Sequence, residues 1–484
     1  MIKESHYSKD ESTNNKMSQK EIKADSKSAD LQYEKMVNTP VSKLIAKLAV
    51  PTVISMLVTS IYNMADTFFV SQINTQASAA VGVVFPIMAI IQAFGFTLGM
   101  GSGSLVSIRL GQKRNSDANV IASTAFFGSI FFGGLVTLFG NLFTPQILRF
   151  IGASETVLPY AQDYATYIFW GAPFICASFV MNNDLRSEGK AYLSMIALTS
   201  GGILNIILDP IFIYGFKLGI SGAAIATLVS QFISFSILLS FYLRKKTVVR
   251  INIKNVSVKD GTLWKIICTG IPSLARQGLA SIASILLNTS AAVYGDAAIA
   301  AMSIATKILM FVASIMIGIG QGFSPVSGYN YGAKRYDRVK KSYWFMVLSG
   351  SSLMTFLAVV IFIFAHPILR AFINDDTAIG IGVTALRWQV SFMPFHPLIV
   401  GTNMLMQSTR HIKSATFLSM NRQGVFFIPA ILILPRIFGL TGVETAQFVA
   451  DVLSSIASIP FLVCFFKKLD RLELEKNNGD VHSV

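Results

Sequence analysis

Runs of about twenty or more mostly apolar residues recur along the chain, and short polar segments separate them. A run of this length, wound as an α-helix, crosses the roughly 30 Å hydrocarbon core of a bilayer. The pattern therefore predicts an all-α integral membrane protein with twelve transmembrane helices. We expect these helices at about residues 43–70, 78–108, 118–143, 157–182, 190–215, 220–243, 263–294, 298–328, 338–364, 377–404, 412–435 and 440–466.

Basic residues are distributed unevenly over the loops between these helices. The loops after the odd-numbered helices contain only Arg149, Lys217, Arg370 and Arg436. The loops after the even-numbered helices are rich in Lys and Arg, at 109–114, 186–190, 244–259, 334–341 and 410–413. Because Lys and Arg accumulate in cytoplasmic loops, both termini are expected in the cytoplasm and the protein in the cell membrane as a multi-pass protein.

The composition agrees with a membrane protein. Hydrophobic residues make up 52% of the 484 residues and charged residues only 13%, which excludes an ordinary soluble protein. The net charge of +15 is explained by cytoplasmic loops beside anionic lipid, so membrane lipid is an expected partner and nucleic acid is not. The three cysteines have no metal-binding spacing, and no cofactor is expected.

An internal repeat divides the chain into two halves. Shifting the sequence by 221 residues aligns Pro51 with Pro272, Pro173 with Pro394, and "GQKR" at 111–114 with "GAKR" at 332–335. Each half has an even number of helices, so the halves share one orientation and a pseudo-two-fold axis along the membrane normal. The predicted domains are a disordered cytoplasmic tail 1–38, a six-helix lobe 39–243, a cytoplasmic linker 244–262, a second six-helix lobe 263–467 and a cytoplasmic tail 468–484.

Two acidic residues lie inside apolar helices of the first half. Asp66 shares a helix face with Ser55, Thr59 and Tyr62 at spacings of 4, 3 and 4 residues. A carboxylate at this depth costs roughly 2.5–3.5 kcal/mol on insertion scales, so the residue needs a structural or functional reason.

Asp209 is the second acid, and Asn205 lies one turn before it on the same face. Because burial disfavours the charged carboxylate, both acids are expected either to take up a proton or to bind a small hard cation such as Na⁺. Pro51, in the same helix as Asp66, provides a point at which that helix bends.

The repeat provides an internal control for these acids. The positions equivalent to Asp66 and Asp209 in the second half are Leu287 and, after a further shift of one residue, Pro429, neither of them acidic. The bundle can therefore form without the carboxylates, which favours a specialised role for the acids in the first half. A purely structural role, in which Asn or Tyr pairs with the acid and holds helices together, remains the alternative.

Other charged positions can be explained by a structural role. Asp451 either faces a cavity, where it attracts cationic compounds, or pairs with Arg422 on the preceding helix. The charged turn that contains Asp184, Arg186, Glu188 and Lys190 is interpreted as a local salt-bridged face at the cytoplasmic surface.

The chain resembles the multidrug and toxic compound extrusion (MATE) family of antiporters over about residues 40–467. The resemblance rests on "YNMADTFFV" at 62–70, "GSGSLVSIRLGQKR" at 101–114, "LNIILDPIFIYGFKLGISGAAIAT" at 204–227 and "GYNYGAKR" at 328–335. It implies a V-shaped pair of lobes that exports bulky, often cationic amphipathic compounds in exchange for H⁺ or Na⁺. In the branch that this chain resembles most, the cation site lies in the N-terminal lobe.

The resemblance also implies roles for particular residues. The cation-coupling positions match Asp66, Asn205, Asp209 and Thr227, with accessory polar positions at Tyr164 and Asn182 and the bending proline at Pro51. Another branch has acids in the C-terminal lobe, but residues 265–294 and 377–404 contain none, so that site is not carried over.

The predicted function is secondary active export of drugs by alternating access, without enzymatic activity and from a monomer. A lipid-linked saccharide flippase of the same superfamily is the main alternative. It would need a strongly cationic cavity, whereas the intramembrane basic residues are only Arg276, Lys307, Arg387 and Arg422. A membrane-embedded enzyme or a channel is less favoured, because no metalloprotease motif and no repeated filter loop is present.

Overall fold

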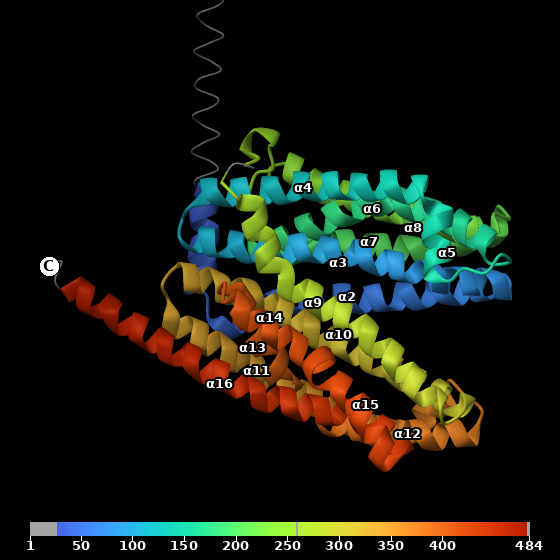
Figure 1. Ribbon diagram of the computed structural model, residues 1–484. Coiled ribbons are helices and arrows are strands. Elements are labelled where there is room, and N and C mark those ends of the chain that lie inside the picture. The colour runs from blue at the N-terminus through green and yellow to red at the C-terminus, as the bar shows by residue number, and fades with distance from the viewer. Residues whose placement is uncertain (1–26, 258–259, 482–484) are drawn as a thin grey trace, which may run out of the picture.

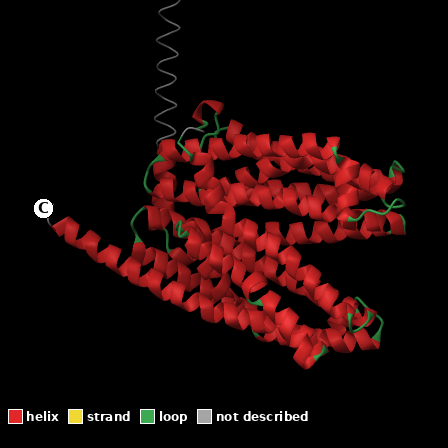
Figure 2. Ribbon diagram, in the orientation of Figure 1, coloured by secondary structure: helices red, strands yellow, loops and turns green. Residues whose placement is uncertain are grey.

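Two bundles of long helices make up the computed structural model, which describes residues 27–257 and 260–481 (Figure 1). Every regular element in these ranges is helical, as Figure 2 shows. The bundles lie against each other at one end and diverge toward the other (Figure 1). We call these two ends the closed end and the open end.

The N-terminal bundle, or N-lobe, contains six long helices and one short helix at the open end. These are α2 (Val41–Ser71), α3 (Thr75–Gly111), α4 (Asn115–Leu142), α5 (Thr144–Ile151), α6 (Leu158–Ser187), α7 (Ala191–Pro210) and α8 (Gly219–Leu243). A π-helical turn, Ile211–Gly215, extends α7 beyond Pro210. The described part of the segment between the lobes contains a 3-10 turn, Ile253–Asn255, and packs on the N-lobe through backbone amides that donate to Asn119, Ser123 and Thr124.

The C-terminal bundle, or C-lobe, repeats this arrangement with two interrupted spans. Its helices are α9 (Thr262–Ala292), α10 (Asp296–Gly332), α11 (Tyr336–Arg370), α12 (Asp376–Ser391), α13 (His396–Ser408), α14 (Ile412–Met420), α15 (Phe427–Phe438) and α16 (Leu440–Val481). A 3-10 turn, Met393–Phe395, separates α12 from α13, and a π-helical turn, Asn421–Val425, separates α14 from α15.

The prediction of twelve spans in two six-helix lobes is confirmed. Ten helices are long and apolar enough to cross a membrane by length and composition. The other two spans are α9, which carries Arg276, Gln277 and Asn288, and the pair α12–α13. The helix expected at 377–404 is interrupted because Pro394 and Pro397 cannot donate the backbone hydrogen bonds that a continuous helix needs.

The predicted tails differ from the structure at both ends of the chain. The disordered tail expected at 1–38 is wrong for residues 27–38, which form a helix that packs against the closed end. Residues 1–26 lie outside the described part. At the C-terminus, α16 continues through the predicted tail 468–484 as far as Val481, and Lys340 forms an ion pair with Asp470 on this extension. Contacts with the lobes therefore order segments that are too polar to form a core of their own.

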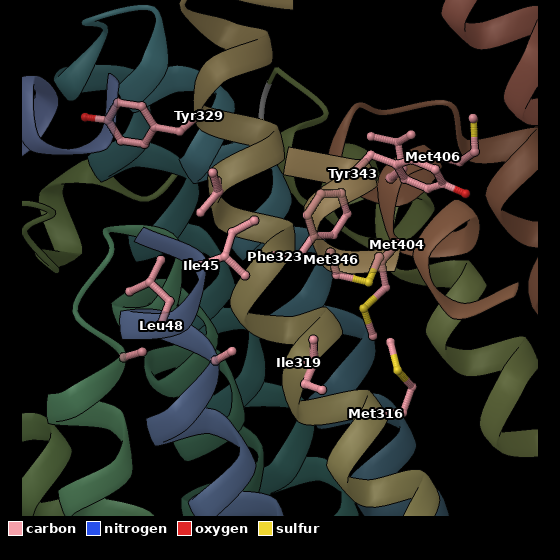
Figure 3. Packing of buried hydrophobic residues seen from close by; sticks show 14 of the residues in the cluster. Ile45, Leu48, Met316, Ile319, Phe323, Tyr329, Tyr343, Met346, Met404 and Met406 are labelled. Carbon is pink, nitrogen blue, oxygen red and sulfur yellow. The ribbon is translucent and has the colours of Figure 1, made fainter. Parts of the chain in front are cut away.

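Buried apolar side chains explain why the lobes meet at one end only. The largest hydrophobic cluster takes residues from both lobes, which meet in it at the closed end; there Figure 3 shows Ile45 and Leu48 of α2 near Ile319 and Phe323 of α10. A second cluster is confined to the N-lobe and a third to the C-lobe. The two lobes therefore share a core at the closed end and have separate cores toward the open end.

Candidate functional site

A buried hydrogen-bonded group joins α7 to α8 inside the N-lobe. The Asn205 amide Nδ2 donates to Asp209 Oδ1 at 3.2 Å and to Thr227 Oγ1 at 3.3 Å. All three side chains are buried, and Asp209 has no exposed surface. Asn205 and Asp209 are one helical turn apart, so α7 presents both to the same neighbour, as the sequence predicts.

Asp66 meets this group from α2. The hydroxyl of Tyr164, a fully buried residue of α6, donates to Asp66 Oδ2 at 3.5 Å. The carboxyl groups of Asp66 and Asp209 are close enough to interact electrostatically, and both also act on Tyr164. The structure thus brings together Asp66, Tyr164, Asn205, Asp209 and Thr227, which we call the acidic cluster.

Three oxygen atoms in the acidic cluster are buried without a hydrogen-bond partner among the described residues. They are Asp66 Oδ1, Asn205 Oδ1 and Asp209 Oδ2. A buried polar atom left unpaired costs about 1–3 kcal/mol, so three in one place call for a ligand. Carboxylate and amide oxygens accept hydrogen bonds from water and are ligands of hard cations, and the carboxylates also accept protons.

A cavity of about 110 Å³ in the N-lobe adjoins the acidic cluster. Asn205 and Thr227 line it on one side. Its remaining walls combine aromatic and methionine side chains with neutral polar ones, including Met56, Met88, Phe96, Phe179, Tyr62, Gln92, Asn182 and Gln231. None of the described residues that line it is basic.

Asn182 lies in the wall of this cavity but not in the acidic cluster. Its amide oxygen accepts hydrogen bonds from Arg186 Nε at 3.2 Å and from the Ser194 hydroxyl. Its Nδ2 atom is buried and has no hydrogen-bond partner in the described part of the chain. The expected accessory position therefore lines the cavity and also contacts Arg186.

Pro51 lies in α2 where this helix leaves the shared core. The next residue, Thr52, donates to the carbonyl oxygen of Gly318 on α10 at 2.6 Å. Proline removes one backbone hydrogen bond of α2 at this point. The weakened turn of α2 is therefore placed beside its contact with the C-lobe.

Asp451 forms an ion pair, which decides between the two alternatives that the sequence leaves open. Arg422 Nε lies 2.7 Å from Asp451 Oδ1, and Arg422 Nη2 donates to Oδ2 at 3.3 Å. Gln447 donates to Oδ1 at 2.8 Å. With both carboxylate oxygens engaged, Asp451 connects α16 to the π-helical turn at Asn421–Val425, and the role in attracting substrate is not supported by this geometry.

The salt-bridged face predicted for the charged turn after α6 is present only in part: Lys190 Nζ lies 3.6 Å from Glu188 Oε2. Asp184 and Arg186 are buried and form no salt bridge with each other; Ser102 donates to Asp184, and Arg186 contacts the other lobe. Glu188 is also buried and accepts from the backbone amides of Val248 and Val249. Burial raises the pKa of Glu188, although Lys190 and these amides oppose the rise.

The repeat contains a signal that could have revealed this. The second-half equivalents of Asp184, Arg186 and Glu188 are the uncharged Leu405, Gln407 and Thr409. If these charges only formed a solvated face, the second half would be expected to carry similar ones. The difference between the halves therefore indicates a role for these charges that is specific to the N-lobe.

A family model described as MatE matches residues 51–211 and 272–432. The second match begins and ends 221 residues after the first, at 272 against 51 and at 432 against 211. This shift equals the internal repeat found in the sequence, so the model matches each lobe once.

Relatives named as multidrug export proteins match nearly the whole chain. The chain is 26% identical over 448 residues to the multidrug export protein MepA of Staphylococcus saprophyticus, covering 92% of this chain and 98% of that protein. It is 27% identical over 447 residues to MepA of Staphylococcus aureus strain MRSA252, with the same coverage. A solved structure described as the outward-facing conformation of a multidrug resistance MATE family transporter superimposes with a TM-score of 0.86 at 27% identity, covering 90% of this chain and 98% of that one.

Proposed function

Because this chain belongs to the MatE family of membrane transporters, we propose that it exports bulky amphipathic, often cationic compounds in exchange for H⁺ or Na⁺. The matched relatives are multidrug export proteins, and multidrug efflux is the activity that the similarity supports. The coupling ion and the site at which it acts are our proposal. The observation that supports this proposal most directly is the group of three unpaired buried oxygens in the acidic cluster.

The acidic cluster supports the proposal because it supplies acceptors without supplying a compensating cation. Among the described residues, the hydrogen-bond partners of Asp66 and Asp209 are neutral, Tyr164 for the first and Asn205 for the second. A proton or a Na⁺ ion would satisfy oxygens that the protein leaves unpaired. Binding of that ion changes the charge beside α2, and α2 contains the proline at which it can bend.

The arrangement of the lobes supports an outward-facing state for this structure. The closed end carries the basic loops, including those at Arg109–Arg114 and Lys334–Lys341, and these loops favour the cytoplasmic side. The open end then faces the exterior, as in the outward-facing structure to which the chain is similar. In this state external protons or Na⁺ reach the N-lobe, α2 bends at Pro51, the cavity narrows and the exported compound leaves.

The lining of the N-lobe cavity supports the substrate class. Aromatic and methionine side chains repack around ligands of different shapes, and the neutral polar groups contribute hydrogen bonds without a fixed charge pattern. A flippase for lipid-linked pyrophosphates would need basic side chains there, and none of the described lining residues is basic.

The test is Asp66→Asn in purified protein reconstituted into liposomes. The substitution keeps the size and hydrogen-bonding capacity of the side chain but removes the titrating group. Transport of a fluorescent organic cation is measured under an imposed proton gradient and then under a sodium gradient. We expect the variant to fold, to bind the cation weakly and to lose at least about 90% of gradient-driven transport, as for removal of a charge acting only in the coupled step.

The matched control is Leu287→Asn, at the repeat-equivalent position of the C-lobe. It introduces the same amide at the same depth and should leave gradient-driven transport unchanged. Wild-type rates in the Asp66→Asn variant under both gradients would assign Asp66 a structural role and overturn the proposal. The gradient that drives the wild-type protein identifies the coupling ion.

A further inference from the structure

Arg186 is a buried cation that reaches from one lobe to the other. It lies near the closed end of α6 and is only 3% exposed. Its Nη1 atom donates to Gln321 Oε1 on α10 of the C-lobe. Its Nε atom donates to Asn182 at 3.2 Å and to Ser194 at 3.4 Å, both in the N-lobe. In residues 27–257 and 260–481, no acidic side chain forms an ion pair with Arg186.

Arg186 lines a small cavity between the lobes, and its third nitrogen is unpaired within the described part of the chain. Nη2 is buried and has no hydrogen-bond partner among the described residues. The adjacent cavity holds about 20 Å³, which is room for one water molecule. Residues of both lobes line it, among them Ser104, Asn183, Arg186, Gln321 and Ser324. The guanidinium group is therefore only partly satisfied, in a place that separation of the lobes would open to water.

The internal repeat shows that the fold does not need a cation here. Position 186 corresponds to Gln407 in the C-lobe, and Gln321 corresponds to Met100 in the N-lobe. Gln407 donates to the Thr269 carbonyl oxygen and to the Ser273 hydroxyl, both within its own lobe. The same helix end is thus built with a neutral side chain and no bond across the lobes, so the charge and the cross-lobe bond are specific to Arg186.

We propose that Arg186 is a positioning residue for transport that holds the closed end shut through Gln321 and connects this closure to the cavity wall through Asn182. The inference rests on the proposed alternating access, but it concerns only the equilibrium between closed and separated lobes. When the lobes separate, water replaces the Gln321 amide oxygen as a hydrogen-bond partner of the Arg186 guanidinium. This guanidinium lacks one hydrogen bond while it is buried, so the closed and separated states compete. A ligand in the cavity that moves Asn182 would also change the hydrogen bond that Arg186 Nε donates to Asn182.

The experiment measures the lobe separation directly. Cys176, Cys268 and Cys464 are replaced, and spin labels are attached at Arg244→Cys and Lys413→Cys, two exposed positions at the closed end of different lobes. Distances are recorded without substrate or gradient. Arg186→Gln, which installs the side chain of the repeat, should raise the ratio of separated to closed molecules by about tenfold, the size expected for losing one hydrogen bond to a charged group.

A double-variant comparison tests the bond itself. Gln321→Ala should produce a shift of similar size, and the combination with Arg186→Gln should add little, because both remove one interaction. Gln407→Ala is the matched control and should leave the ratio unchanged. In transport assays, Arg186→Gln should lower the maximal rate about tenfold and change the KM less than twofold, since Arg186 does not line the N-lobe pocket.

Several outcomes would overturn the inference. An unchanged distance distribution in both single variants, additive shifts in the double variant, or an equal shift in Gln407→Ala would each do so. If Arg186→Gln does not accumulate in the membrane, Gln321→Ala decides alone, because it retains the cation. Loss of coupling in Asp66→Asn has no bearing on these distances, so the proposed function and this inference fail separately.

Discussion

Two buried acids of this protein show how neighbours decide the role of a charge inside a membrane protein. Asp451 is bound by Arg422 and Gln447, and both of its oxygens are engaged. Asp209 accepts a single bond from Asn205 and has an unpaired oxygen. The first arrangement is complete without a ligand, and the second is not.

At the Arg422–Asp451 pair, this contrast predicts that removing one partner destabilises the protein and that replacing both partners with apolar residues does not. Asp451→Ala leaves a partly buried guanidinium without its partner, so we expect a loss of stability between the ~1 kcal/mol of an exposed pair and the ~3–5 kcal/mol of a fully buried one. The combination Arg422→Met/Asp451→Leu should recover most of this loss. Thermal unfolding in detergent measures both, and cation transport by the double variant should remain close to wild type.

A large transport defect in a stable Arg422→Met/Asp451→Leu protein would contradict the structural role. It would return Asp451 to the alternative in which the acid faces the transported compound.

At the same scale, the sequence predicts some side chains well and others poorly. The helix period places Asn205 beside Asp209, and the structure joins them. The same reasoning predicts a salt-bridged face for Asp184 and Arg186, because residues near a helix end at the membrane surface are commonly solvated. Here the closed end buries them, and burial by a second lobe is not encoded in local spacing.

At the scale of elements, the helix at residues 27–38 connects the two lobes at the closed end. Toward the N-lobe, Gln32 donates to the Glu188 carbonyl oxygen at 2.6 Å, and Lys113 lies 4.4 Å from the Tyr33 ring centre. Toward the C-lobe, the Tyr33 ring lies 5.9 Å from that of Tyr329. The helix therefore stabilises the closed end only while both lobes are together.

Deleting residues 1–38 should consequently weaken the closed end. We expect a melting temperature lower by several degrees, the effect of losing about 1–2 kcal/mol, and a larger population with separated lobes. The control deletes only residues 1–26 and leaves these contacts in place. Equal behaviour of the two truncations in thermal unfolding and in lobe-distance measurements would show that the helix contributes nothing to closure.

Mixed charge hides this helix in the sequence, but a signal is present. Ala29, Tyr33, Met36 and Val37 recur at helical spacing, and Met36 is fully buried. A single short stripe of this kind has no partner within its own segment. The surface on which this helix packs forms only when the two lobes come together. The composition of the segment alone therefore predicts disorder.

At the scale of the whole molecule, the repeat accounts for most of what the sequence predicts correctly. A shift of 221 residues relates the contacts between lobes as well as the helices within them. A Cβ atom at Gly111 would overlap the Tyr329 carbonyl oxygen, and one at Gly332 would overlap the Ile108 carbonyl oxygen. Position 111 corresponds to 332 and position 108 to 329, so these are two copies of one contact. The resemblance implies the V shape, but which end of the lobes is closed could not be predicted, because the proposed alternating access requires one sequence to support closure at either end.

This paired contact yields a prediction that tests the symmetry of closure. The obstructing atoms are backbone oxygens, which cannot rotate away as a side chain can, so a methyl group at either glycine must push α3 and α10 apart. Gly111→Ala and Gly332→Ala should therefore each increase the separated population at the closed end, by amounts that agree within about twofold, as equivalent sites should. Gly134→Ala, in α4 where a Cβ meets nothing within 4 Å, is the control; it should leave lobe distances unchanged and gain roughly 0.5–1 kcal/mol of helix stability. A shift in only one of the two interface variants would mean that the lobes do not close symmetrically about the axis that relates them.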